Sequence, residues 1–200
     1  MASARRALDT RRTAQVNSGP TRTRDQAPTP VLRQSQHAAI PARVMMNRVD
    51  ACPSCGAAVA GGAEGCQRLF DELSVRLTSS GNLPYTVRRL AVDCYCLQHP
   101  DSYCVSAKSL AAHLTGLCWA MEFEGGEPGL KALQAWLNGR VPLVKPAIPS
   151  SRGLLTVRDV FDEQDSLGLA VARWAHATWA AYADLHPITR RWVMEAARRG

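Results

Sequence analysis

Apolar residues recur at helical spacing along most of the chain, and this periodicity limits the fold more than any other feature. Leu69, Leu73 and Leu77 begin the pattern, in which every third or fourth residue is apolar. Such spacing places the apolar side chains on one face of an α-helix. Comparable stripes occupy residues 87–97, 110–121, 130–137, 167–185 and 188–193. Because no strand-like alternation persists and no internal repeat occurs, the sequence predicts a mainly α protein, a small helical bundle.

Residues with capping chemistry mark where several of these helices begin. Ser106 can accept a hydrogen bond from a backbone N–H in the first turn of the helix that follows it. Thr156 and Asp159 have the spacing of a reciprocal cap, with aspartate in place of the usual glutamate. Pro187 fits the first turn of a final helix. Three prolines in residues 141–153 exclude a regular helix there, and the apolar residues between them favour packing along the domain.

The sharpest local motif is Cys-Pro-Ser-Cys-Gly at residues 52–56. Two cysteines separated by two residues can place both thiolates on one tetrahedral metal ion, and the glycine allows a tight turn. Zinc suits this geometry and needs two further ligands. Two alternatives remain. A thioredoxin-type redox pair would need an α/β context instead of the small-residue loop at residues 57–65, and the two cysteines can also be free thiols in a loop.

Three residues are candidates for completing the metal site. Cys66 begins a predicted helix eleven positions after Cys55, so the intervening loop can fold it back toward the motif. His99 lies at a predicted helix end, where its ring can point away from the helix. His113 lies on an apolar helix face, where a histidine is more often a hydrogen-bonded core residue than a ligand. The predicted metal ligands are therefore Cys52, Cys55 and Cys66, completed by His99 or His113.

Other polar residues in the same region are candidates for catalysis. Asp93 can orient a ligand histidine or act as a base toward a metal-bound water, although composition alone favours a solvated surface aspartate. Gln98 lies close by in the sequence. His186 occurs in a Leu-His-Pro corner that echoes the earlier Gln-His-Pro, and the two corners either converge on one pocket or are alike by coincidence. Residues expected to pack in the core are Cys94, Cys96, Cys104, Cys118, Trp174, Trp179, Tyr182 and Trp192.

The formal charge of +7 is concentrated near the N-terminus. Residues 1–50 hold nine arginines and three aspartates, a net charge of +6, whereas the rest of the chain has a net charge of +1. The composition of the remainder therefore gives no case for a nucleic-acid-binding surface. No apolar run approaches the roughly 20 residues of a membrane span. Seven cysteines, an odd number, without an apolar signal segment favour the reducing cytoplasm.

Residues 1–46 differ in composition from the rest of the chain. They are rich in Arg, Thr, Ser, Gln, Pro and Ala and cannot bury enough apolar surface to offset the entropy of ordering, so we expect a disordered tail. An Arg-rich, acid-poor start also resembles an organelle transit peptide. Alternatively, translation starts at Met45 or Met46 and the preceding residues are a wrongly assigned leader. Residues 47–200 are expected to form a single helical metal-binding domain.

The motifs follow one another in a specific order. CPxCG comes first, followed by a lone cysteine at the start of a helix. Next come the motifs V-D-x-Y-x-x-Q-H-P and S-x-x-x-H-L-x-x-L. The last is a segment with two tryptophans and a histidine before R-x-W. They correspond to residues 52–56, Cys66, Val92, Asp93, Tyr95, Gln98, His99, Pro100, Ser109, His113, Leu114, Leu117, Trp174, Trp179, His186, Arg190 and Trp192. Over residues 50–195 this pattern resembles an uncharacterised bacterial family, domain-of-unknown-function family 5946.

The resemblance identifies residues and implies no activity. The family has a longer, aromatic-containing loop before the lone cysteine, so the placement of Cys66 is less well defined in this chain. The cysteines expected in the core are not part of the family pattern.

The leading hypothesis is a cytoplasmic zinc-binding protein. Cys52, Cys55, Cys66 and one histidine would hold a structural zinc that fastens the N-terminal loop to the bundle. Beyond binding this structural zinc, the protein would have a binding or regulatory role.

Two further hypotheses involve chemistry at the same residues. A metal-dependent, hydrolase-like enzyme would have an open coordination position near Asp93, His99 and His113, with Asp93 as base. His99, His113 or His186 would serve as ligands or acid. It predicts an open pocket lined by these four side chains. A thiol redox switch would oxidise Cys52 and Cys55 reversibly without a metal.

Overall fold

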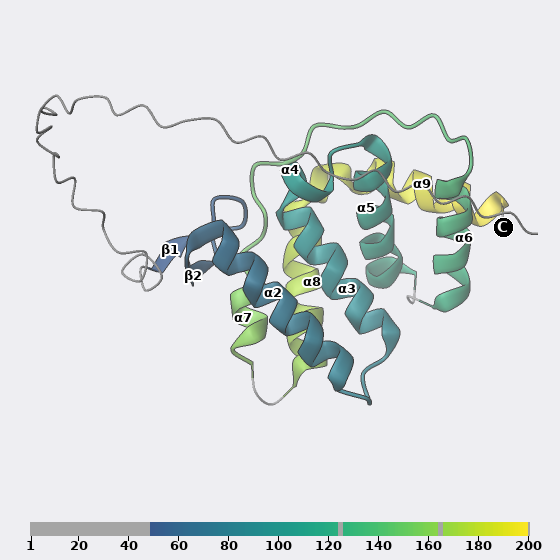
Figure 1. Cartoon of the computed structure of the whole chain (residues 1–200). Coiled ribbons are helices and arrows are strands. Elements are labelled where there is room, and N and C mark those ends of the chain that lie inside the picture. Colours follow the sequence, from purple (N-terminus) through teal and green to yellow (C-terminus); the bar gives the residue numbers. More distant parts are fainter. Residues whose placement is uncertain (1–48, 124–125, 164–165, 200) are drawn as a thin grey trace, which may run out of the picture. The chain divides into compact units, whose positions relative to one another are not determined.

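The computed structural model describes residues 49–123, 126–163 and 166–199, and it confirms the mainly α fold. The expected disordered tail, residues 1–46, lies outside this range. A short hairpin precedes the helices of the described part (Figure 1). The elements in chain order are β1 (Val49–Ala51), β2 (Ala58–Ala60), α2 (Gly62–Ser79), α3 (Tyr85–Gln98), α4 (Pro100–Tyr103), α5 (Ala107–Glu122), α6 (Glu127–Asn138), α7 (Val157–Phe161), α8 (Leu167–Ala181), the 3-10 turn η1 (Ala183–Leu185) and α9 (His186–Arg199).

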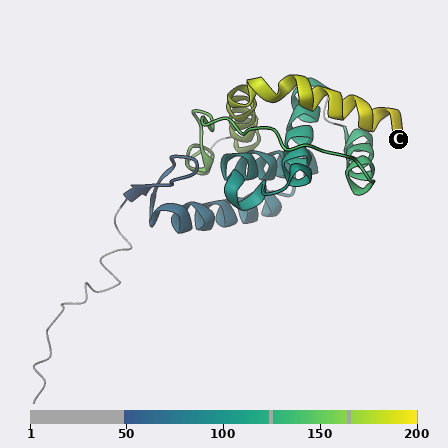
Figure 2. The same ribbon diagram turned by 90° about the horizontal axis from the view of Figure 1, so that it is seen from above.

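The helices form a bundle around α3. This helix packs against α2, α5 and α8, while α9 lies against α5 and α6, as two views at right angles show (Figures 1 and 2). The apolar stripes predicted from the sequence meet in the interior. Leu73 of α2, Leu97 of α3, Leu114 of α5 and Trp174 of α8 are all fully buried. The hydrophobic effect therefore holds these helices together through the faces that the periodicity identified.

The predicted caps begin the helices as expected. The Ser109 N–H donates to the Ser106 hydroxyl at 3.0 Å, and the Ser106 N–H donates to the Ser109 hydroxyl at 3.0 Å. The Thr156 N–H donates to the Asp159 carboxylate at 2.7 Å. Pro187 is the second residue of α9. These bonds satisfy N–H groups that the first turn of a helix leaves unpaired.

The helix predicted over residues 167–185 ends earlier than expected, at Ala181. The chain tightens into η1, in which the Leu185 N–H donates to the Tyr182 carbonyl at 2.8 Å. The Tyr182 hydroxyl donates to the Leu97 carbonyl of α3 at 2.5 Å, which ties this corner to the core. A new helix then begins at His186, where Pro187 needs no hydrogen-bond acceptor.

Gln98 fastens the proline-containing segment to the bundle. Its amide nitrogen donates to the carbonyls of Arg152 and Leu155, both at 2.7 Å, and its amide oxygen accepts a hydrogen bond from the Trp174 indole at 3.0 Å. Gly153 has φ +100° where the segment passes the backbone of α8. The segment thus packs along the helices, as predicted (Figure 1), and Gln98, a candidate for the site, has a structural position instead.

The hairpin buries little apolar surface, so its own strands contribute little to its stability. β1 and β2 pair antiparallel, with Asp50 opposite Val59. All of β1 is exposed, and Val59 is the one buried residue of the two strands. Both strands contact α2. An isolated two-stranded hairpin is marginal in water, so this one depends on what joins it to the helices.

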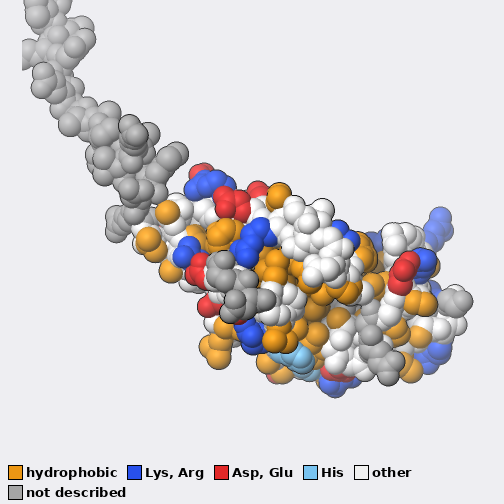
Figure 3. Space-filling model, turned by 90° about the horizontal axis from the view of Figure 1, so that it is seen from below, with side chains coloured by type: hydrophobic (Ala, Val, Ile, Leu, Met, Phe, Trp, Pro, Cys, Tyr) orange, Lys and Arg blue, Asp and Glu red, His pale blue; other side chains and the backbone are white. Residues whose placement is uncertain are grey.

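The surface shows charges of both signs. On the face drawn in Figure 3, Lys and Arg side chains lie interspersed with Asp, Glu and hydrophobic side chains. Among the described residues, no helix combines the length and the apolar character that crossing a bilayer requires.

Candidate metal centre

Cys52 and Cys55 lie on the turn of the hairpin. The Cys52 N–H donates to the Ala57 carbonyl at 2.8 Å, and the Gly56 N–H donates to the Cys52 carbonyl at 2.8 Å. Gly56 has φ +80°, a left-handed conformation that favours glycine. The turn directs both thiols inward, so that Cys52 is 2% and Cys55 8% exposed. The motif therefore forms a closed knuckle with its sulfurs on the inner side.

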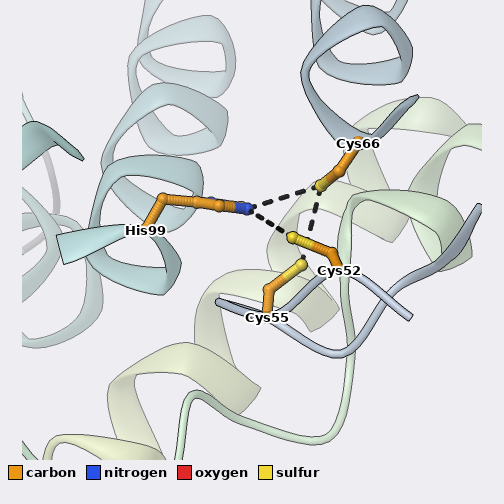
Figure 4. Close-up of side chains that lie close together, drawn as sticks. All are labelled: Cys52, Cys55, Cys66 and His99. Atoms are coloured by element: carbon orange, nitrogen blue, oxygen red, sulfur yellow. Dashed lines mark hydrogen bonds between the residues drawn. The ribbon is translucent and has the colours of Figure 1, made fainter. Parts of the chain in front are cut away.

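Cys66 reaches the knuckle because the start of α2 lies directly against β2. Gly61 and Gly62, with φ +85° and +56°, turn the chain between the strand and the helix. A Cβ on Gly65 would lie 2.0 Å from the Ala60 carbonyl oxygen, far inside contact distance. Only glycine allows so close an approach, and it leaves the fully buried Cys66 facing the hairpin (Figure 4).

His99 comes from the junction of α3 and α4. Its Nδ1 lies 2.7 Å from the Tyr95 carbonyl oxygen, and its ring stacks on the Tyr95 ring with centroids 4.0 Å apart. Phe70 of α2 also stacks on Tyr95, at 3.9 Å. A carbonyl only accepts, so Nδ1 carries the proton and Nε2 presents its lone pair to the thiols. A hydrogen bond of this kind commonly orients a metal-ligating histidine.

The four side chains converge on one point (Figure 4). The Sγ atoms of Cys52, Cys55 and Cys66 and a ring nitrogen of His99 all lie within 4.8 Å of one another. Nε2 of His99 is 3.5 Å from Cys52 Sγ and 3.4 Å from Cys66 Sγ, and the Cys55 and Cys66 sulfurs are 3.6 Å apart. A tetrahedral zinc with bonds of about 2.3 Å to sulfur and 2.0–2.1 Å to nitrogen requires about 3.8 Å between sulfurs and about 3.6 Å between sulfur and nitrogen. These three distances match that geometry within a few tenths of an ångström.

The electrostatics of the cluster match the same donor set. A hydrogen bond from Cys66, aided by His99, lowers the pKa of Cys55 to about 4 against the opposing effect of burial. The pKa of Cys66 is raised, because its proton is held by the Cys55 thiolate and because the thiol is buried. Adjacent buried thiols cannot all ionise unless a cation compensates their charge. The cluster is therefore compatible with a metal site.

The remaining cysteines lie outside the cluster, and burial favours the neutral thiol form of each. Burial raises the pKa of Cys96 to about 12, of Cys104 to about 11 and of Cys118 to about 12, and it raises that of Cys94 well above the ordinary value. All four are buried in or beside helices. They remain protonated and pack as small core residues, as predicted.

Asp93 and His113 form a second cluster, apart from the four converging residues. The interpretation of Asp93 as a solvated surface residue is wrong, because only 1% of it is exposed. His113 Nδ1 lies 2.8 Å from Asp93 Oδ1. Arg89 Nε donates to both carboxylate oxygens, at 3.0 and 2.9 Å. His113 is thus a hydrogen-bonded residue at the α3–α5 contact. Sequence reasoning missed Arg89, although its position four residues before Asp93 on a helix was a usable signal.

His186 occupies a third place. Its ring stacks on Trp179 with centroids 3.7 Å apart, and its Nε2 lies 2.9 Å from the Trp179 carbonyl oxygen. Nearby, Arg190 and the Trp179 indole donate to Glu122. The structure therefore places the predicted candidates His99, His186 and the Asp93–His113 pair at three separate positions.

The comparisons with known proteins agree with the residue pattern. Neither the curated proteins nor the solved structures contain a significant match to the chain. The family comparison matches residues 50–183, more than half of the chain, to a family of unknown function. That range includes the four converging residues and the Asp93–His113 pair, and it ends before His186. The chain therefore belongs to the Family of unknown function DUF5946.

Proposed function

We propose that the protein binds one zinc ion through Cys52, Cys55, Cys66 and His99, and that this ion is structural. The observation that supports the proposal is the convergence of four buried donor atoms within 4.8 Å. Three thiolates and one imidazole are soft and borderline ligands, which favour zinc over magnesium or calcium. The hydrogen bond between His99 Nδ1 and the Tyr95 carbonyl supports the role of Nε2 as the fourth ligand.

A structural role suits the completeness of the donor set. Catalytic zinc sites commonly keep one position open for water, whereas structural sites use four protein ligands. The four residues are between 0% and 8% exposed, which leaves little access for a substrate. Residues 47–200 then act as a single metal-binding domain in the cytoplasm, with a binding or regulatory role built on the bundle.

The zinc would supply what the hairpin lacks. Two ligands come from the hairpin turn, one from the start of α2 and one from the end of α3. Zinc-finger peptides gain about 10–16 kcal/mol on binding zinc near neutral pH, against about 1 kcal/mol for a typical hydrogen bond. A single ion can therefore fix an otherwise exposed hairpin to the bundle.

The enzyme and redox hypotheses require other properties of the site than the structural-zinc proposal does. An open site near Asp93, His99 and His113 would need these side chains to face one ion, but Asp93 and His113 bond to each other instead. A redox switch at Cys52 and Cys55 would work without a metal. The zinc content of protein purified with a thiol reductant and without chelators separates the redox hypothesis from ours.

The test compares two histidine variants. We expect one zinc per chain in the wild-type protein, loss of zinc in His99→Gln, and full zinc content in His113→Gln, measured by inductively coupled plasma mass spectrometry. Cys55→Ser should lose zinc and Cys96→Ser should retain it. Wild-type protein without stoichiometric zinc, or equal zinc loss in the two histidine variants, would rule out the proposed ligand set.

A further inference from the structure

A cavity of about 710 Å³ lies between the start of α3, one face of α5 and α6. Its volume falls within the usual range of small-molecule sites, about 300–1,000 Å³. None of the four converging residues lines it. From its lining we propose that the cavity binds a small organic oxyanion with an apolar body, and that Arg89 holds the anionic group.

The Arg89 side chain is held in place by hydrogen bonds, as suits an anion-binding residue. Its Nε donates to the buried carboxylate of Asp93, and its Nη2 lies 3.4 Å from the Ala112 carbonyl oxygen. A guanidinium has five N–H donors, more than these acceptors use. The side chain is 33% exposed and lines the cavity, so the fixed guanidinium borders the space that a ligand would fill. A planar, preorganised donor group of this kind suits carboxylate and phosphate oxygens.

The packing of α5 is fitted to the Arg89–Asp93 pair. A Cβ on Gly116 would lie 2.5 Å from Asp93 Oδ2 and 3.2 Å from Arg89 Nη2. Glycine at this position therefore leaves room for the ion pair between the two helices. Buried ion pairs often add little net stability, because removing both charges from water costs about as much as their attraction returns. A purely structural reason for this pair is therefore weak, and its position at the cavity wall supports a binding role.

The charged lining favours an anion. Arg89, Lys108 and Lys131 line the cavity as cations, while Glu127 is the acid among its lining residues. Glu127 is paired with Lys131 at 2.9 Å, one turn away on α6. Because Asp93 pairs with Arg89 and Glu127 pairs with Lys131, the cavity keeps a net excess of one positive charge, which favours an anion over a cation.

The rest of the lining defines the body of the ligand. Leu130, Leu133 and Leu137 lie along α6, and Ala112 lies opposite them on α5. Small-molecule sites commonly combine such an apolar wall with a few polar groups that fix orientation. The expected ligand therefore has one carboxylate or phosphate group and an aliphatic or aromatic body. This site is independent of the zinc proposal, because it shares no lining residue with the four converging side chains.

The first experiment uses the wild-type chain with its zinc. Octanoate and phenyl phosphate are titrated into ¹⁵N-labelled protein, with octanamide as the neutral analogue of octanoate. We expect shifts concentrated in the amides of residues 106–116 and 130–138, and octanoate affinity at least about tenfold above that of octanamide, as one charge-assisted contact supplies. The stronger of the two anions identifies the preferred oxyanion. The absence of binding by both anions, shifts centred elsewhere, or equal affinity for octanamide would overturn the proposal.

Two variants then separate a binding role from a structural one. Ala112→Leu fills the cavity without changing a charge, and Ala180→Leu on the exposed face of α8 is its control. Arg89→Lys keeps the charge but lacks the guanidinium donors. We expect Ala112→Leu to abolish octanoate binding, Arg89→Lys to reduce the octanoate-to-octanamide ratio, and all three variants to keep one zinc. Unchanged anion selectivity in Arg89→Lys, or unchanged binding in Ala112→Leu, would contradict the assignment.

Discussion

The contact between Gly65 and β2 allows a direct test of how the proposed zinc site is assembled. In Gly65→Ala the new Cβ would lie 2.0 Å from the Ala60 carbonyl oxygen and 2.9 Å from its carbon. Carbon–oxygen contacts of this kind begin at about 3.3 Å. The hairpin and α2 must therefore separate by more than about 1 Å, because both clashing atoms belong to the backbone and no side-chain rotation relieves them.

The expected magnitude follows from two opposing effects. Overpacking of a close contact costs about 1–3 kcal/mol. Replacement of glycine by alanine in a helix stabilises it by up to about 1 kcal/mol, and by less in the first turn where Gly65 lies. The net effect is a loss of about 1–2 kcal/mol. Because the same displacement moves Cys66 away from Cys52 and Cys55, we expect the apparent zinc affinity to fall by about tenfold, which corresponds to about 1.4 kcal/mol.

Two assays measure this effect. Urea unfolding of the zinc-loaded protein gives the stability, and competition with a chromophoric chelator gives the zinc affinity. Gly81→Ala is the control, since a Cβ there meets nothing within 4 Å, and its stability should stay within about 0.5 kcal/mol of the wild type. Wild-type stability together with wild-type zinc affinity in Gly65→Ala would refute the argument that the close approach of α2 to β2 builds the site.

Two further predictions concern the framework around the centre. Gln98→Leu leaves the Arg152 and Leu155 carbonyls and the Trp174 indole without their partner, so urea unfolding should show a loss of about 3 kcal/mol, and trypsin should cleave faster after Arg152. Exposed Gln134→Leu is the control, and equal protease resistance in the two variants would contradict the clamp. Hydrogen bonds lower the pKa of Glu122 below its ordinary 4.5, and the bond from Arg190 has the largest effect. The stabilisation by this carboxylate is present above pH 4.5 and is lost as the pH falls through the lower folded pKa. Thermal unfolding of Glu122→Gln should therefore depend less on pH below 4.5 than that of the wild type, and identical pH profiles would count against the pairing.

Local features of the fold were predictable because their causes are local. The helical stripes, the caps at Ser106 and Thr156 and the knuckle at residues 52–56 each depend on residues within a few positions of one another. The end of α8 at Ala181 was not predictable from the sequence. The hydrogen bond from Tyr182 to Leu97, which fixes the turn after α8, joins residues far apart in the sequence.

The candidate metal centre was likewise predictable only in its local part. The sequence narrowed the histidine to His99 or His113 and could go no further, because the choice depends on the contact between α3 and α5. Asp93 lies beside Gly116 of α5 and bonds to His113, and neither relation has a signal in linear spacing. The role of Gly65 is likewise invisible until α2 is placed against β2. Which candidate site residues lie together is decided by how distant helices pack, and the periodicity of the sequence does not encode that packing.

X-ray absorption spectroscopy at the zinc edge tests the central claim most directly. On full-length protein purified with reductant and without chelator, a structural site formed by Cys52, Cys55, Cys66 and His99 predicts three sulfur scatterers at about 2.3 Å and one nitrogen at about 2.0–2.1 Å. The signal of the nitrogen ligand should disappear in any residual zinc of His99→Gln and persist in His113→Gln. A spectrum with two or fewer sulfur ligands, or with an additional oxygen ligand from water, would contradict the closed four-ligand site.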